Sequence, residues 1–371
     1  MHVLLWNRHN ARTHPGGDTV QWEHTARELE ALGVEVELTT DPRPDLAGFD
    51  LVHLFNLQCV EEALPVAEQA RAAGLPLALS TIWWDPIEAK YVSARGRWLT
   101  MRLREWAVGR PKGLAHFRAW KLSRKRSHRT RAQVHRLLEL SDVLLPNSVG
   151  ELRVMEDYFE LGDLSDKAVI VPNATTGAAA PPPTASGLRA GVLCVGRVYP
   201  LKNQLALIEA LCGLDAELVL VGDLSYEAYV AECRRAAARH GRCQLLGPLA
   251  HEALGAHYRA ARVHVLPSFR ETPGLVSLEA AAHGATVVTT DRGPTREYFG
   301  DDAYYLDPAS GDSIRAAVER ALAAPLQVSA ERLGRFTWRK AALATRQAYR
   351  WLLDRGAERP GSLDVDCERY A

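Results

Sequence analysis

The chain has little that would anchor it in a membrane or cross-link it covalently. None of its apolar runs approaches the about 18 residues that a membrane-spanning helix needs. The apolar start at residues 2–6 ends at Asn7 and Arg8, so we expect no signal peptide. The 6 cysteines are scattered without a C-x-x-C pair, which favours buried, reduced thiols over a disulfide framework. These absences predict a cytoplasmic protein.

The chain also lacks a net charge, with 45 basic and 45 acidic residues. The balance hides an asymmetry, because residues 95–136 hold fourteen Lys and Arg against one acid, Glu105. These basic residues are interleaved with Trp and Leu, a pattern typical of peripheral binding to an anionic membrane surface. A solvated helical face that pairs with the acidic remainder of the chain is an open alternative. Nucleic acid is not an expected partner, since no nucleic-acid-binding motif accompanies the charge.

Length and periodicity indicate two α/β halves. The chain has 371 residues, enough for two domains. Short apolar runs alternate with helical patterns on both sides of a stretch rich in Ala, Pro, Thr and Gly at 175–187. This alternation predicts βαβ units with mainly parallel sheets. The predicted strands are 2–6, 34–40, 50–55, 75–82 and 142–148 in the first half, and 191–196, 216–222, 243–247, 262–267 and 285–290 in the second.

The most informative stretch is PSFRETPGLVSLEAAAHG at 267–284. It follows a predicted strand and places Glu271 and Glu279 on either side of a turn at Pro273 and Gly274, which leads into a predicted helix. The unpaired N–H groups at a helix N-terminus bind anions. Carboxylates beside such a site are poor phosphate ligands but good acceptors for sugar hydroxyls. The combination predicts a ligand with a phosphate end and a polyol end, a nucleotide sugar.

A second cluster lies at the start of the second half. Gly196 and Arg197 close the strand at 191–196, and Lys202 follows at the mouth of a predicted helix. In doubly wound sheets ligands bind at the carboxyl ends of the strands. The planar fork of Arg197 and the compact charge of Lys202 together suit a pyrophosphate.

The combined pattern VGR-x4-K and E-x7-E resembles the retaining glycosyltransferases of family 4, the glycosyl transferases of group 1. The resemblance implies a GT-B fold, in which two Rossmann-like doubly wound domains face each other across a cleft. It covers nearly all of 1–355, including Gly16-Gly17-Asp18, 293–297 and 304–308. The domains it implies are 1–172 on the acceptor side, 173–337 for the nucleotide sugar, and 338–371, a helix that crosses back to the first domain, plus a tail.

The resemblance also implies roles for single residues. Arg197 and Lys202 would neutralise the donor pyrophosphate, and Glu271 would accept hydroxyls of the donor sugar. Glu279 would bind the ribose, and the loop after Gly247 is predicted to contact the base. The donor-binding residues are then Gly17, Gly196, Leu249, Gly274, Leu275, Val276 and Glu279. No metal cofactor is expected, since the two cations serve the leaving phosphate, and the nucleotide diphosphate sugar is a substrate.

The acceptor side departs from the family pattern. Many members carry a histidine just after the strand that corresponds to 75–82, where this chain has Ile82 or Trp83. Acceptor-side candidates are Asp18, Trp83, Trp84 and Asp85. Asp18 is equally a helix N-cap, and the tryptophans equally pack between domains. His53 is expected to be a satisfied core histidine.

The expected function is transfer of a sugar, with retention, from a nucleotide diphosphate to a sugar, lipid-linked or small-molecule acceptor. Such an enzyme serves cell-surface glycan, glycolipid or metabolite glycosylation. A non-catalytic nucleotide-sugar-binding protein and a GT-B epimerase or hydrolase are the open alternatives. The residues do not specify the base, the sugar or the acceptor.

Overall fold

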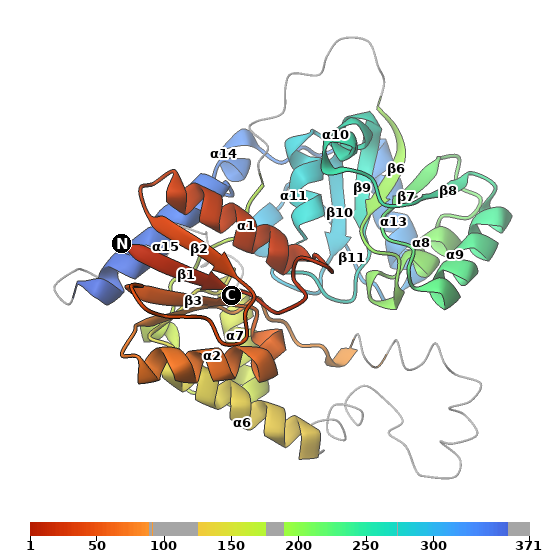
Figure 1. The fold of residues 1–371 in the computed structure, drawn as a ribbon. Helices are drawn as coiled ribbons and strands as arrows, with labels where there is room; N and C mark the ends of the chain where they lie inside the picture. The colour runs from red at the N-terminus through yellow and green to blue at the C-terminus, as the bar shows by residue number, and fades with distance from the viewer. Residues whose placement is uncertain (89–90, 92–124, 176–188, 273, 355–371) are drawn as a thin grey trace. The chain divides into compact units, whose positions relative to one another are not determined.

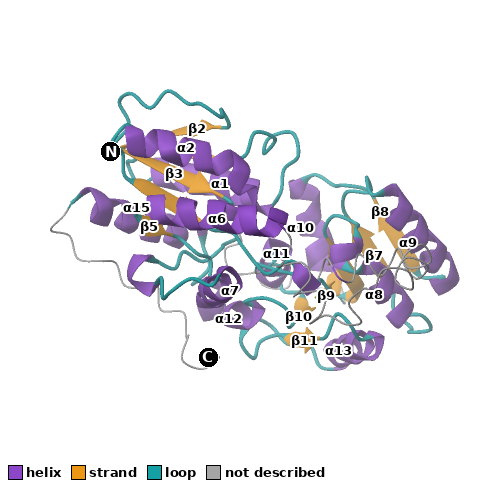
Figure 2. Cartoon of the chain, turned by 90° about the horizontal axis from the view of Figure 1, so that it is seen from below, coloured by secondary structure: helices purple, strands orange, loops and turns teal. Residues whose placement is uncertain are grey.

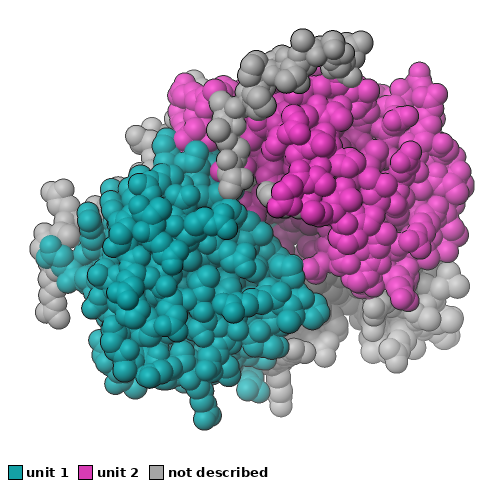
Figure 3. All heavy atoms as spheres, turned by 45° about the horizontal axis from the view of Figure 1, so that its top comes forward, with its two compact units in different colours: residues 1–85, 115–174, 336–371 teal, residues 86–114, 175–335 magenta. Residues whose placement is uncertain are grey.

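The computed structural model of the chain describes residues 1–88, 91, 125–175, 189–272 and 274–354. The chain divides into two compact units (Figure 3). Unit 1 comprises 1–85, 115–174 and 336–371, and unit 2 comprises 86–114 and 175–335. Most of the basic segment 95–136, namely 95–124, lies outside the described residues, as does the tail after 354.

Unit 1 is built on a five-stranded sheet in the order β2-β1-β3-β4-β5, with every pair parallel. Adjacent β1 and β3 flank the point where the strand order reverses, and in such sheets ligands bind beside the carboxyl ends of these strands. The strands are β1 (His2–Trp6), β2 (Glu35–Thr39), β3 (Leu51–Phe55), β4 (Leu77–Ser80) and β5 (Val143–Leu144).

Alternate residues of these strands enter two cores, one on each face of the sheet. Leu5 of β1 packs with α1 and α15 on one face, whereas Leu4 packs on the other face with α2, α6 and α7. The helices α2 and α6 lie side by side, as Figure 1 shows. The helices of unit 1 are α1 (Gly17–Glu30), α2 (Val60–Ala72), α6 (Lys125–Leu140), α7 (Val149–Phe159) and α15 (Trp338–Leu353), with short 3₁₀ turns at Leu57–Cys59 and Ser165–Lys167.

Unit 2 repeats the design on a six-stranded parallel sheet, in the order β11-β10-β9-β6-β7-β8. The reversal of strand order falls between β6 and β9. The strands are β6 (Ala190–Val195), β7 (Leu218–Val221), β8 (Cys243–Leu246), β9 (Ala261–Leu266), β10 (Thr286–Thr290) and β11 (Tyr304–Leu306).

Helices cover both faces of this sheet as well (Figure 2). α8, α9 and α13 share one core with the sheet, and α10 and α11 share the other. The helices are α8 (Gln204–Ala210), α9 (Glu227–His240), α10 (His251–Ala260), α11 (Leu275–Ala282), α12 (Thr295–Phe299), α13 (Gly311–Ala323) and α14 (Ala330–Leu333). The short turn η3 (Pro200–Lys202) precedes α8.

The predicted fold class is confirmed, since both units are doubly wound α/β structures with parallel sheets. Two local predictions differ from the structure. The strand expected at 142–148 is only Val143–Leu144. The helix expected from 201 is interrupted at Asn203, whose φ of 61° is left-handed and whose side-chain amide donates to the Pro308 carbonyl. In the part of the chain that the structure describes, no helix is both long and apolar enough to cross a membrane.

Candidate functional site

The carboxyl end of β6 in unit 2 turns sharply at Gly196. Its φ is 148°, a conformation that favours glycine. The turn packs against the end of β7, where a Cβ on Gly222 would lie 2.1 Å from the Gly196 carbonyl oxygen. Both glycines are therefore needed for the two strand ends to approach, and this approach sets the position of Arg197.

Lys202, at the end of η3, forms an ion pair with Glu271. Both side chains are largely buried, with 19% of Lys202 and 5% of Glu271 exposed. Burial opposes the charge on Lys202, but the attraction of Glu271 outweighs it, so the pKa of the ammonium is raised above 10.5. The pair joins the first strand–helix connection of unit 2 to the loop after β9.

Arg197 is the more accessible cation at this edge. Half of its side chain is exposed, and its Nε lies 3.5 Å from an Asp223 carboxylate oxygen. Its backbone carbonyl accepts a hydrogen bond of 2.9 Å from the Gln204 amide. The backbone of Arg197 is thus held in place. Its guanidinium can bind an anionic ligand, because the exposed pair with Asp223 is weak and the ligand can displace it.

The loop after β9 leads from Glu271 into α11. Gly274 precedes the helix with a φ of 89°, and a Cβ there would lie 3.2 Å from a Glu271 carboxylate oxygen. Leu275 and Val276 open α11, and the N–H groups of a first helical turn have no partners within the helix. The glycine lets these donors lie beside the Glu271 carboxylate. Pro273 itself falls outside the described residues.

Gly293 holds the backbone of Glu271 from behind. Its φ is 124°, and a Cβ on it would lie 2.2 Å from the Glu271 carbonyl oxygen. No side chain fits in that space, because the contact atom belongs to the backbone. Sequence reasoning recognised the segment that begins at Gly293 but did not connect it with Glu271.

Glu279 lies on α11, more than one helical turn after Gly274. It accepts a hydrogen bond of 3.0 Å from the hydroxyl of Tyr258, a buried residue of α10. Burial and the Glu279 carboxylate raise the pKa of the Tyr258 hydroxyl, which therefore stays a donor at neutral pH. Leu249 and Val276 pack on the same apolar core, so that the loop after β8 and the start of α11 share one side of the sheet.

In unit 1 the glycine loop between β1 and α1 leads directly into a helix. Gly16 is the N-cap of α1 and Gly17 its first residue. Asp18 is buried, and its carboxylate pairs with Arg8 at 2.7 Å. Of the two alternatives for Asp18, the N-cap role is wrong, because Gly16 occupies that position.

The turn after β4 carries the remaining acceptor-side candidates. Trp83 is only 5% exposed, and its ring packs 4.7 Å from the Tyr158 ring and 4.8 Å from the Phe159 ring, measured between centroids. Its ring therefore lies in the core of unit 1. Trp84 and Asp85 are half-buried, so we retain these two residues of the turn as acceptor-side candidates.

A buried carboxylate that sequence reasoning missed holds this turn in place. Glu151 of α7 accepts hydrogen bonds from the Thr81 hydroxyl, from the Trp83 amide at 2.8 Å and from the Asn147 amide at 2.9 Å. Between the first two lies Ile82, with a φ of 42° that is strained for a β-branched residue. Strain of this kind persists only where the surroundings fix the backbone.

His53 of β3 is a satisfied core histidine, as expected. Its Nδ1 lies 2.6 Å from the Tyr349 hydroxyl of α15, and its Nε2 lies 2.9 Å from the Ser80 hydroxyl. Burial lowers the pKa of the imidazole to about 3, so the ring is neutral. Within the described ranges, no three His, Cys, Asp or Glu side chains are grouped so that they could hold a metal ion.

Comparison with known proteins gives a direct match for unit 2. Residues 189–324 match the family model described as glycosyl transferases group 1. This region of unit 2 is similar to the group 1 glycosyl transferases. The match contains Gly196, Arg197, Lys202, Glu271 and Glu279, the residues on which the resemblance rested.

The curated relatives are distant. The D-inositol 3-phosphate glycosyltransferase of Kineococcus radiotolerans is 31% identical over 60% of this chain and 60% of its own length. The enzyme of the same name from Geodermatophilus obscurus is 32% identical over 56% of this chain and 52% of its own length. The chain thus spans little more than half the length of these relatives.

Solved structures match over a greater length and show the fold. A sucrose-phosphate synthase from Thermosynechococcus elongatus is 18% identical, with a TM-score of 0.71 over 95% of this chain and 99% of that chain. Anabaena Alr3699/HepE in complex with UDP is 17% identical, with a TM-score of 0.67 over 95% of this chain and all of the other. The predicted GT-B fold, with its two Rossmann-like domains, is confirmed.

Proposed function

We propose that the chain is a retaining glycosyltransferase that takes a sugar from a nucleotide diphosphate sugar. The observation that carries the proposal is the buried Lys202–Glu271 pair beside the N-terminus of α11. A cation, a carboxylate and the N–H groups of a first helical turn lie within one loop cluster at the carboxyl edge of a doubly wound sheet. This is where such sheets bind nucleotides.

Each group has a task in breaking the bond to the anomeric carbon. Negative charge builds on the leaving diphosphate, and Arg197, Lys202 and the amides of Leu275 and Val276 stabilise it. Glu271 pairs with Lys202 when no donor is bound. With a donor present, the three N–H donors of the ammonium serve carboxylate and phosphate together, and the carboxylate keeps lone pairs for sugar hydroxyls.

The remaining donor contacts follow from the same edge of unit 2. Glu279, fixed by Tyr258, accepts hydrogen bonds from the ribose hydroxyls, and Leu249 packs on the base. Gly196 and Gly274 keep side chains out of the space that the donor occupies, and Gly17 does the same in unit 1. We infer UDP as the nucleotide to test first, because structures of the similar HepE hold UDP and UDP-glucose.

Donor binding tests this assignment most directly. Titration calorimetry compares UDP-glucose, UDP and uridine on the wild type and on Arg197→Ala. We expect the variant to lose at least about tenfold in affinity for UDP, from a charge-assisted hydrogen bond of about 1.5–3 kcal/mol, while uridine binding is unchanged. Arg239→Ala, which removes a more exposed arginine from α9, is the control. Equal losses for UDP and uridine would contradict the pyrophosphate assignment.

Turnover separates an enzyme from a binding protein. Glu271→Gln keeps the shape of the side chain but removes the charge that pairs with Lys202. We expect sugar transfer and donor hydrolysis to be lost in this variant while UDP still binds. Unchanged turnover would favour the non-catalytic alternative, and a change in the sugar's configuration without transfer would favour an epimerase.

We propose that unit 1 supplies the acceptor side, with Asp18, Trp84 and Asp85 as contacts. The acceptor is a sugar, a lipid-linked sugar or a small metabolite. The names of the curated relatives make D-inositol 3-phosphate the first compound to test. We also propose that the protein is cytoplasmic and binds the membrane surface peripherally through 95–136. The full chain should then pellet with anionic phosphatidylglycerol vesicles at low salt. Equal pelleting with neutral phosphatidylcholine vesicles would contradict it.

A further inference from the structure

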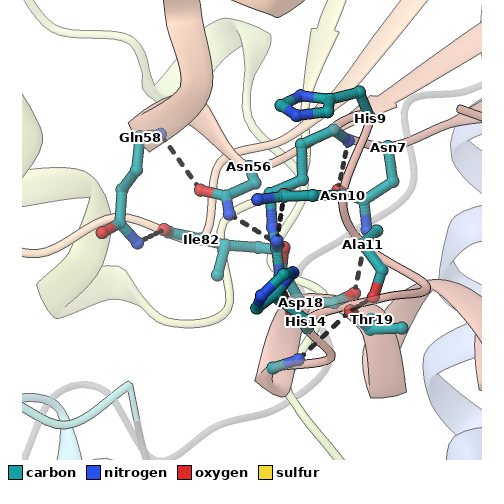
Figure 4. A network of polar contacts seen from close by, with 12 residues as sticks. Asn7, His9, Asn10, Ala11, His14, Asp18, Thr19, Asn56, Gln58 and Ile82 are labelled. Atoms are coloured by element: carbon teal, nitrogen blue, oxygen red, sulfur yellow. Dashed lines mark hydrogen bonds and ion pairs between the residues drawn. The ribbon is translucent and has the colours of Figure 1, made fainter. Parts of the chain in front are cut away.

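A continuous chain of polar contacts runs along the carboxyl edge of the unit 1 sheet, from β1 to β3 to β4. Arg8, just after β1, holds the Asp18 carboxylate of α1. The side-chain amide of Asn56, just after β3, donates to the same carboxylate at 3.0 Å. Gln58 binds Asn56 through its backbone amide and the Ile82 carbonyl through its side chain. Figure 4 shows this chain crossing three loops.

Arg8 holds the glycine loop more rigidly than a surface arginine would. Its Nε and one Nη bind the two Asp18 oxygens, at 2.7 and 3.1 Å, in a forked arrangement. The other donors reach the Asn10 side chain and the His14 carbonyl. The hydrogen bond with Asp18 raises the pKa of the guanidinium. Only 14% of the side chain is exposed, and its contacts with Asp18 and Asn10 are partly buried.

The backbone conformations of Asn56 and Ile82 indicate that these polar contacts constrain the loops. Their φ values are 78° and 42°, and both residues belong to the chain of contacts. Left-handed conformations of non-glycine residues are uncommon and cluster at functional sites, where the surroundings hold them in place. Here several hydrogen bonds hold the loops after β1, β3 and β4 at one edge of the sheet.

The Asp18 carboxylate keeps one unused position. A carboxylate accepts about four hydrogen bonds. Among the described residues, Asp18 Oδ2 accepts from Arg8 and Asn56, whereas Oδ1 accepts from Arg8 alone. A Cβ on Gly16 would lie 2.7 Å from that same Oδ1. Gly16 has a φ of −141°, which any residue adopts, so the backbone does not require glycine there. The glycine instead leaves the Oδ1 side of the carboxylate open.

We propose that Arg8 and Asn56 are positioning residues that aim Asp18 Oδ1 at a hydroxyl group of the acceptor. The proposal deepens the proposed function and rests on it. A carboxylate without a proton takes only donors, so the group it selects is an O–H or N–H and not a phosphate or carboxylate. The recognised part of the acceptor is therefore a sugar or polyol hydroxyl.

The test replaces the acceptor by water, so that the acceptor need not be known. UDP-glucose hydrolysis and UDP-glucose binding are measured on the wild type, Arg8→Lys and Asn56→Asp. Arg8→Lys keeps the charge but loses the fork, and Asn56→Asp removes the donor and sets a second carboxylate against Asp18. Thr13→Asp, which adds the same charge to an exposed side chain of the loop, is the control.

We expect hydrolysis to fall about tenfold or more in both variants at pH 8, with the Kd for UDP-glucose within about twofold of the wild type. The Asn56→Asp enzyme should regain activity as the pH is lowered toward 5.5. When two carboxylates are in contact, their repulsion favours the uptake of one proton between them. That proton then forms the hydrogen bond that the Asn56 amide donated in the wild type. Charged or titratable groups that face this carboxylate are Arg8 from the loop before α1 and Cys59 from the 3₁₀ turn after β3, and Glu62 of α2 lies beyond them, near Arg8 and Cys59.

Two results would overturn the proposal. One is an unchanged hydrolysis rate in Arg8→Lys and Asn56→Asp. The other is a loss in Asn56→Asp that is equal at every pH and matched by faster amide exchange throughout unit 1, which would mean a purely structural role. A wild-type protein that does not bind UDP-glucose would instead reject the proposed function, a result that the binding measurement shows separately.

Discussion

The Lys202–Glu271 pair allows a quantitative test of how the donor site is held together. Lys202→Met removes the ammonium but keeps a side chain of similar length. It leaves Glu271, which is 5% exposed, without its cation. Removing one partner of a buried ion pair costs about 3–5 kcal/mol. Because 19% of Lys202 is exposed, we expect a loss near the lower end, about 3 kcal/mol.

The double variant separates the pair from its parts. Glu271→Gln leaves Lys202 without its counter-charge, so it too should be destabilised by about 3 kcal/mol. If the two groups stabilise mainly each other, Lys202→Met combined with Glu271→Gln costs less than the sum of the single changes. We expect a coupling energy of about 2 kcal/mol, within the range for residues in direct contact.

The choice of probe follows from where the tryptophans lie. Those that the structure describes, at 6, 22, 83, 84, 338 and 351, all belong to unit 1. Because the sequence has 9 tryptophans and those at 98 and 106 fall in the range of unit 2, fluorescence in urea is not specific to unit 1. Amide hydrogen exchange of peptides from β1 and β3, where no shift is expected, serves as the internal control. Amide hydrogen exchange of peptides from β6 and β9 reports on unit 2, where the loss should appear.

The pH dependence gives a second, independent check. The folded-state pKa of Lys202 is raised above 10.5, so the pair's contribution is fully present at neutral pH and is lost only as the pH rises through that raised value. In Lys202→Met this loss at high pH should be absent, because no ammonium remains to lose its proton. A deficit below about 1 kcal/mol at pH 7, or a coupling below about 0.5 kcal/mol, would refute the reasoning.

Three further outcomes test the packing behind the site. Gly293→Ala should destabilise unit 2 by about 3 kcal/mol or more and abolish UDP binding, because its Cβ would overlap the Glu271 carbonyl. Gly241→Ala, which also has a positive φ but lies in open space, should cost only about 1–2 kcal/mol, measured by urea unfolding. Burial lowers the pKa of His53 and of His264 to about 3, so both units should be fully stable above pH 6.5 and lose stability as the pH falls toward 3, measured by urea unfolding. His264→Leu should flatten that loss in unit 2 alone, since no described residue hydrogen-bonds either ring nitrogen; an equally steep loss would show that another group titrates.

Much of the fold could be predicted because its cause is local. Leu4 and Leu5 face opposite cores as neighbours on a strand must, and short apolar runs of this kind mark every predicted strand. The break at Asn203 was missed because its cause is the distant Pro308 carbonyl. The strand at 142–148 was overextended because burial continues to residue 148, whereas the regular strand ends at Leu144.

The same distinction separates the predicted from the missed parts of the site. Arg197 and Lys202 lie five positions apart, and Glu271 and Glu279 eight, so each pair is visible as a short pattern. Glu151 binds Thr81 from seventy positions away, and nothing in either neighbourhood marks the contact.

Glycine carries a signal that sequence reasoning can only half interpret. Gly274 and Gly293 have positive φ values, and such positions are predictable where turn patterns are strong. Gly16 has an ordinary extended backbone that any residue could adopt. Glycine is favoured there because a Cβ would lie only 2.7 Å from Asp18 Oδ1. Gly16 in unit 1 and Gly274 in unit 2 thus leave space beside a buried carboxylate, whereas Gly293 leaves space for the backbone carbonyl of Glu271. The positions of the Asp18 and Glu271 carboxylates therefore depend on neighbouring glycines, which have no Cβ, as well as on the cations Arg8 and Lys202.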